Sequence, residues 1–108
     1  MGPALGFVAL LLTGCASAPL RLEGTPVGAL NPEVTQSNIQ STICRPGWTA
    51  SVRPASSFTN GVKQRLMIEH RVPAHRSGEY ELDHFIPLAL GGHPRSLDNL
   101  WLQPWKGE

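Results

Sequence analysis

The adjacent residues Asp83 and His84 are the side chains in this sequence best suited to chemistry. A neutral imidazole takes up a proton near pH 7, which makes His84 a candidate general base. The carboxylate of Asp83 is a hard oxygen ligand of the kind that Mg²⁺ and Mn²⁺ prefer. Neighbouring residues on a strand point to opposite faces, so both side chains reach one site only where the strand end is distorted. The pair therefore predicts a metal-assisted acid–base site at the end of a strand.

Two short strands joined by a long loop are expected to position this pair. Residues 80–85 alternate polar and apolar side chains, which is typical of a half-buried strand. Gly91-Gly92 predicts a turn in the following loop, because glycine adopts turn conformations without steric cost. Residues 98–102 predict the second strand. Asp83-His84 then lies on one arm of the hairpin and Asn99 on the other.

The segment before the hairpin predicts short elements separated by loops. A short helix is expected after Thr35 or Ser37, and Pro46-Gly47 must end it. Residues 48–52 alternate weakly and predict a strand. Residues 59–70 predict a helix with an apolar inner face and with Lys63 and Arg65 turned outward; the inner face comprises Val62, Leu66 and Met67. The sequence thus predicts a small α+β domain with short helices and a two-stranded hairpin around a long loop.

Length and composition set the limits of this domain. The chain has 108 residues with a formal charge of +1, which excludes a multidomain enzyme and a polybasic nucleic-acid tail. Ten prolines and eleven glycines imply a loop-rich fold with little regular core. Three further histidines stand in polar, loop-like contexts and are expected to be exposed to solvent: His70, His75 and His93.

The charges are distributed unevenly along the chain. Residues 45–78 carry six Lys and Arg against Glu69 alone, whereas residues 79–108 carry two basic against five acidic side chains. This order brings phosphate-binding cations close to metal-binding carboxylates if the two segments fold together. The alternative is a set of unrelated solvated charges, which is ordinary on small domains.

The amino terminus is predicted to lie outside the fold. Residues 7–12 form a short apolar run, and Leu12-Thr13-Gly14-Cys15 resembles the lipobox of bacterial lipoproteins. That resemblance implies a signal peptide over residues 1–14, lipidation of Cys15 and a lipid anchor in the cell envelope, on the periplasmic side or at the cell surface. Residues 15–30 then form a flexible tether to a domain over 31–108. The pattern departs from the lipobox type in lacking a basic residue before the apolar run, and a buried strand with an incidental cysteine is the alternative.

The motif around the Asp-His pair is similar to that of a known family. The run Glu81-Leu82-Asp83-His84-Phe85-Ile86-Pro87-Leu88, then Gly91-Gly92, then Asn99-Leu100 resembles the HNH endonuclease motif. Within that family the chain looks most like small bacterial and phage proteins. The resemblance extends over about residues 31–106, and the order and spacing of its residues are more specific than an isolated Asp-His pair.

The resemblance implies a metal-dependent endonuclease that hydrolyses phosphodiester bonds in DNA. His84 becomes the general base, Asp83 a metal ligand, and Asn99 a residue that braces the loop and orients His84. The expected cofactor is Mg²⁺ or Mn²⁺, with Zn²⁺ as an alternative. Four basic side chains are candidates for positioning phosphates: Arg45, Lys63, Arg65 and Arg95. The expected partners are DNA and, through the lipid anchor, a membrane; the sequence does not identify a protein partner.

One part of the family pattern is missing from this sequence. HNH motifs end in a helix that supplies a further metal ligand and completes the ββα-metal unit, and no such helix is expected after Lys106. The family's C-terminal segment often carries a cysteine that could pair with Cys44, and that cysteine is missing here as well. The sequence therefore predicts a C-terminally incomplete HNH domain and leaves two functions open. One is a nuclease or a truncated remnant of one; the other is a non-catalytic, lipid-anchored binding or structural module.

Overall fold

The computed structural model describes Gly2 and residues 26–106, which form a small α+β fold as predicted. The predicted signal peptide and the lipidation site at Cys15 lie outside the described residues. Within those residues, no helix is long and apolar enough to cross a membrane. The regular elements are α1 (Trp48–Val52), α2 (Ser56–Glu69), β1 (Tyr80–His84) and β2 (Leu100–Pro104), with short 3₁₀ turns at Gln36–Asn38 (η1), Ala74–Glu79 (η2), Leu88–Leu90 (η3) and Leu97–Asn99 (η4).

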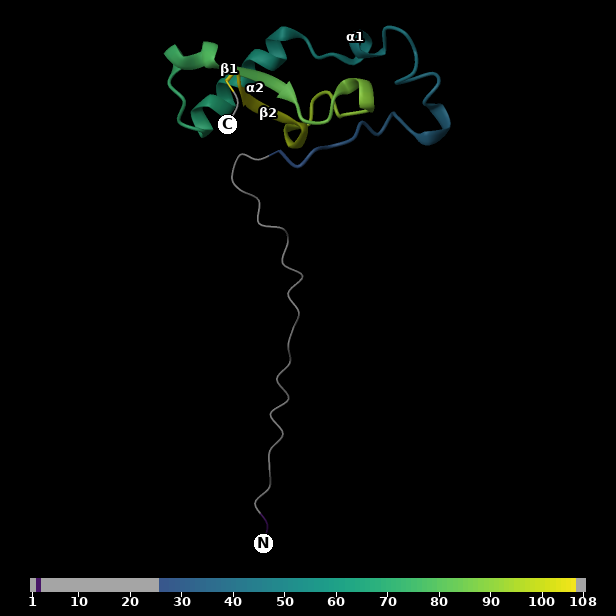
Figure 1. Cartoon of the computed structure of the whole chain (residues 1–108), viewed down its shortest axis with the longest axis horizontal. Coiled ribbons are helices and arrows are strands. Elements are labelled where there is room, and N and C mark those ends of the chain that lie inside the picture. The colour runs from purple at the N-terminus through teal and green to yellow at the C-terminus, as the bar shows by residue number, and fades with distance from the viewer. Residues whose placement is uncertain (1, 3–25, 107–108) are drawn as a thin grey trace.

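The predicted hairpin is present as the antiparallel pair β1 and β2. Their register places Asp83 opposite Trp101 and His84 opposite Leu100. β2 starts two residues later than predicted, because η4 occupies residues 97–99 and the Ser96 hydroxyl accepts its Asp98 N–H. Helix α2 packs against both strands (Figure 1), and the core comprises Trp48, Val62, Met67, Leu88 and Leu100.

Helix α2 confirms the predicted helix and extends it at the start by three residues. Val62 and Met67 are buried and Leu66 is half-buried, as the apolar spacing predicted. Lys63 differs from the prediction that it points outward. It is half-buried, and its Nζ donates to the carbonyl of Ser77 in η2 at 2.9 Å. The amine thereby ties the helix to the turn that leads into β1.

The strand predicted over residues 48–52 is wrong, because this segment is the helix α1. Gly47 precedes it with a left-handed φ of 82°, which lets the chain turn into the helix. Trp48 and Val52 stand four residues apart and so lie on one face of the helix. Two such positions also share a face in a strand, so weak alternation over five residues does not distinguish the two structures. Trp48 is buried, and α1 packs against η3.

The helix predicted after Thr35 is reduced to the 3₁₀ turn η1. The side chain of Asn38 accepts the Thr35 N–H at 2.8 Å and donates to the Glu33 carbonyl at 2.8 Å. These bonds offer the backbone a local alternative to continued helix. Ile39 and Ile43, at and after the end of this turn, are both half-buried.

Residues 26–30 are part of the domain and not of the predicted tether. The Gly28 N–H donates to the Asp98 carbonyl at 2.9 Å, and the Asn31 N–H donates to the Gly91 carbonyl at 2.8 Å. Leu30 forms an isolated antiparallel bridge with Gly92. Figure 1 shows this blue segment running beneath the other elements. The folded part therefore begins by Gly28, a few residues before the predicted start at Asn31.

Candidate functional site

His84 is the last residue of β1, and its ring is held by the loop between the strands. Nε2 lies 2.9 Å from the carbonyl oxygen of Pro94. Because a carbonyl only accepts, Nε2 must carry the hydrogen, which leaves the lone pair of the neutral ring on Nδ1. In the described part of the chain, Nδ1 has no hydrogen-bond partner. This tautomer is the one that a general base acting through Nδ1 requires.

Asp83 and His84 alternate across β1 and still meet at one edge of the sheet. The Phe85 N–H donates to the Asn99 carbonyl of the neighbouring chain segment, so the His84 N–H faces the open edge of β1. Asp83 Oδ1 accepts this N–H at 2.8 Å. The carboxylate therefore folds back over the strand edge beside His84. This bond holds the Asp83 carboxylate against the backbone of His84, and the loop distortion that the family resemblance implies stays a prediction.

Two hollows meet at this edge. A groove of about 610 Å³ lies between α2 and β1, and a smaller hollow of about 220 Å³ extends toward α1 and η3. Arg53, Asp83 and His84 line both, whereas Lys63 and Glu81 line the larger one only. We call the larger hollow the His84 groove. It combines a proton acceptor, two carboxylates and two cations in one solvent-accessible space.

Asn99 is fully buried and braces the loop that follows His84. Its Oδ1 accepts the Ile86 N–H at 2.8 Å and the Ala29 N–H at 3.4 Å, and its Nδ2 donates to the carbonyls of Ile86 at 3.1 Å and His93 at 2.9 Å. These partners are all backbone groups. Asn99 thus has the geometry of the predicted brace, and it reaches His84 only through the loop.

Gly92 allows this loop to close. A Cβ at this position lies 1.9 Å from the carbonyl oxygen of Ile86 and 2.9 Å from Nδ2 of Asn99. The preceding Gly91 has a left-handed φ of 85°, so both glycines of the predicted turn are required by the backbone.

Substitution Gly92→Ala is expected to destabilise the domain by about 2 kcal/mol or more, because the added methyl group overlaps backbone that cannot move freely. Urea unfolding followed by tryptophan fluorescence measures the change. Gly61→Ala in α2 is the matched control, since nothing lies within 4 Å of its Cβ position. Equal unfolding midpoints for the two variants contradict the expectation.

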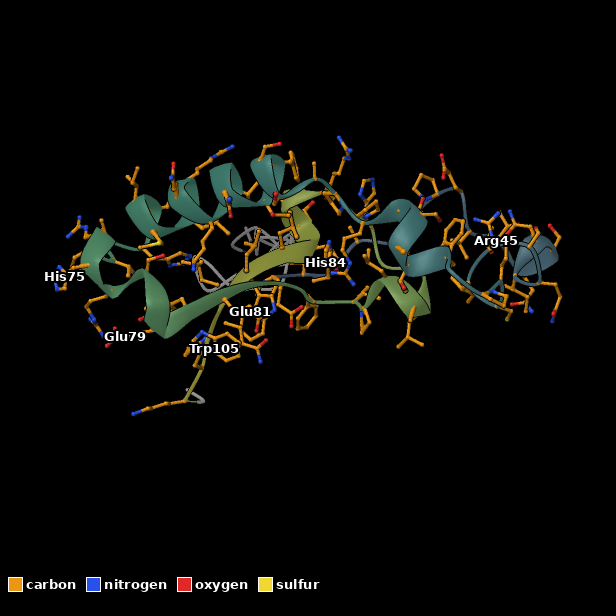
Figure 2. The ribbon with its side chains drawn as sticks, turned by 90° about the horizontal axis from the view of Figure 1, so that it is seen from above. Arg45, His75, Glu79, Glu81, His84 and Trp105 are labelled. Carbon is orange, nitrogen blue, oxygen red and sulfur yellow. The ribbon has the colours of Figure 1, made fainter. Side chains whose placement is uncertain are left out.

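The four predicted phosphate-binding cations are not gathered in the groove. Lys63 lines it, but Arg65 forms an exposed ion pair with Glu69 at 3.0 Å. The Arg45 guanidinium lies over the ring of Trp48, and that of Arg95 lies over the ring of Phe58. In Figure 2, Arg45 lies near one end of the molecule, well away from His84.

Arg53 is the groove residue that sequence reasoning missed. It follows α1 directly and precedes Pro54, which restricts its backbone to the extended conformation found here. Among the described residues its guanidinium has no hydrogen-bond or ion-pair partner. The basic balance of residues 45–78 indicated cations near the acidic segment. Within that run, the Arg-Pro step at the end of an element was the signal that distinguished Arg53.

His93 also differs from the sequence expectation, which was exposure to solvent. Its ring is half-buried, and Nδ1 accepts the N–H groups of Arg95 and Ser96, each at 3.0 Å. His70 and His75 are exposed as predicted. His93 is therefore part of the loop that holds His84.

The donor chemistry at the groove fits a hard divalent cation. Asp83 and Glu81 stand two residues apart on β1 and both line the groove. Carboxylates suit Mg²⁺ or Mn²⁺, whose remaining positions are commonly filled by water and substrate phosphate. Within residues 26–106, no group of three or more His, Cys, Asp and Glu side chains gathers as a metal site. Cys44 is a free, exposed thiol on the surface.

Comparison with known proteins does not identify a family for this chain. The chain matches no family model, and neither a curated protein nor a solved structure is found to be similar to it. The functional argument therefore depends on the motif residues of this chain and on the geometry of the His84 groove.

Proposed function

We propose that this protein is a metal-dependent endonuclease of the HNH type that hydrolyses phosphodiester bonds in DNA. The observation that carries the proposal is the His84 ring, whose Nε2 is held by the Pro94 carbonyl and which lines an open groove together with Asp83. Phosphodiester hydrolysis requires an activated water and stabilisation of charge on the phosphate, and the groove contains residue types for both.

The chain's own residues have distinct roles in this proposal. His84 Nδ1 removes the proton from the attacking water, and the bond from Nε2 to Pro94 stabilises the imidazolium that forms. Arg53 and Lys63 line the same groove and offset the negative charge of the phosphate. Asp83, with Glu81 beside it, would hold a divalent cation, which polarises the phosphate when bound.

Conversion of supercoiled plasmid to the nicked form tests the proposal. Nicking by the purified full chain is expected with Mg²⁺ or Mn²⁺ and is expected to stop when EDTA removes the cation. Failure to nick plasmid DNA with either cation overturns the proposal. Under the same proposal, the lipobox-like segment ending at Cys15 anchors the enzyme in the cell envelope.

Arg53→Gln is expected to raise KM for DNA about tenfold, because a charged partner of the phosphate is lost from the groove. Arg71→Gln is the matched control. It removes the same charge from an exposed residue that does not line the groove, and KM should change less than twofold. Steady-state nicking rates at several plasmid concentrations give both values. Equal KM values for the two variants contradict the role of Arg53.

A second function, a non-catalytic binding module, is favoured by one observation. The described residues bring two carboxylates, and no third protein ligand, to the groove. Such a site holds a cation weakly, whereas Arg53 and Lys63 remain able to bind an anion. DNA binding without any metal-dependent nicking supports this function, and nicking abolished by EDTA excludes it.

A further inference from the structure

His93 shapes the turn that presents the Pro94 carbonyl to His84. Its ring Nδ1 accepts the N–H groups of Arg95 and Ser96, the two residues after Pro94, at 3.0 Å each. This is the pattern by which a side-chain acceptor caps the two N–H groups that follow a turn residue. Pro94 stands between His93 and these two residues and has no N–H of its own that needs an acceptor. The two bonds fix the backbone on the far side of Pro94.

The backbone of His93 is fixed on the near side as well. Its N–H donates to the Ala29 carbonyl at 2.8 Å, and its carbonyl accepts from Asn99 Nδ2 at 2.9 Å. The turn over residues 93–96 is thereby held at both ends. These bonds hold the Pro94 carbonyl oxygen in place relative to β1, at 2.9 Å from Nε2 of His84.

We propose that His93 is a positioning residue, which acts through Pro94 to hold His84 in the tautomer with its lone pair on Nδ1. The proposal rests on the assignment of His84 as the general base. When the ring of His93 is removed, the N–H groups of Arg95 and Ser96 lose their acceptor, and the Pro94 carbonyl is free to move. The His84 ring then loses the acceptor that selects its tautomer and orientation.

His93→Ala is expected to lower kcat for plasmid nicking about 100-fold, since a displacement near 1 Å in a catalytic group has an effect of that size. KM should change less than twofold, because His93 does not line the His84 groove. His93→Asn should restore most of kcat. The asparagine side chain accepts the same two N–H groups, as it does in other turns.

Nitrogen-15 NMR of the His84 ring supplies a readout that does not depend on activity. In the wild type and in His93→Asn, the spectrum should show the tautomer protonated at Nε2. In His93→Ala it should show a mixture of the two tautomers. Because this measurement needs no DNA cleavage, it decides the role of His93 even if the full chain proves not to be a nuclease.

Two results overturn the proposal. One is a His93→Ala protein whose His84 tautomer and kcat both equal those of the wild type. The other is a His93→Asn protein that regains the wild-type unfolding midpoint in urea while His84 remains a mixture of tautomers. The second result limits His93 to a stabilising role in the loop.

Discussion

Replacing His84 with alanine is expected to slow metal-dependent nicking of supercoiled DNA by roughly 100- to 10,000-fold, the usual contribution of a general base. The structure supports so large an effect because the ring combines a fixed tautomer with access to the groove. Nε2 bonds to Pro94 O at 2.9 Å, and the ring lines both hollows beside Asp83. Initial rates of plasmid nicking with Mg²⁺ or Mn²⁺ measure the loss.

The matched control is His75→Ala. His75 is exposed in η2 and lies near the opposite end of the molecule from Arg45, away from His84 (Figure 2). Its variant should nick DNA at the wild-type rate. If His84→Ala also nicks at that rate, the assignment of His84 as the base is wrong.

The same variant separates the two proposed functions. Removal of the imidazole leaves Arg53 and Lys63 in the groove, so His84→Ala should still bind a DNA oligonucleotide with near wild-type affinity. Under the nuclease proposal, binding persists while cleavage is lost. Under the binding-module proposal, the wild type and the variant behave alike in both assays.

The hairpin was predictable because its information is local. Residues 80–85 alternate, Gly91-Gly92 marks the turn, and tight packing at Gly92 leaves room for no other residue. The segment 48–52 was not predictable in this way, because five residues fit a strand or one helical turn equally well. Its conformation is decided by the burial of Trp48 and by the left-handed Gly47, which depend on the rest of the fold.

The site shows the same division between local and distant information. The sequence indicated Asp83, His84 and Asn99 from a short motif, and the structure places all three around one loop. Arg45 was predicted to position phosphate and Arg53 was not, although both stand in one basic segment. The difference arises from tertiary structure: Arg45 lies over Trp48, whereas Arg53 lies at the groove.

Asn99→Ala is expected to destabilise the domain by about 3 kcal/mol or more, because each buried group left without a partner costs about 1–3 kcal/mol. The Asn99 side chain is fully buried, at 0% exposed. Its removal takes away the hydrogen-bond partner of the Ile86 N–H and of the carbonyls of Ile86 and His93. A domain of this size has a total stability on the order of 5–10 kcal/mol. Urea unfolding followed by tryptophan fluorescence measures the loss.

Gln64→Ala provides the control for Asn99→Ala, since it removes an amide from an exposed position on α2 and should change stability by less than about 0.5 kcal/mol.

Asn99→Ala should lose nicking activity together with stability, because the bonds that hold the loop also fix the Pro94 carbonyl through His93. His84→Ala should lose activity with little change in stability, since the half-buried ring has a single hydrogen bond. A stable Asn99→Ala protein that nicks DNA at the wild-type rate contradicts the bracing role. A loss of stability in Asn99→Ala that is not seen in His84→Ala distinguishes the brace from the base.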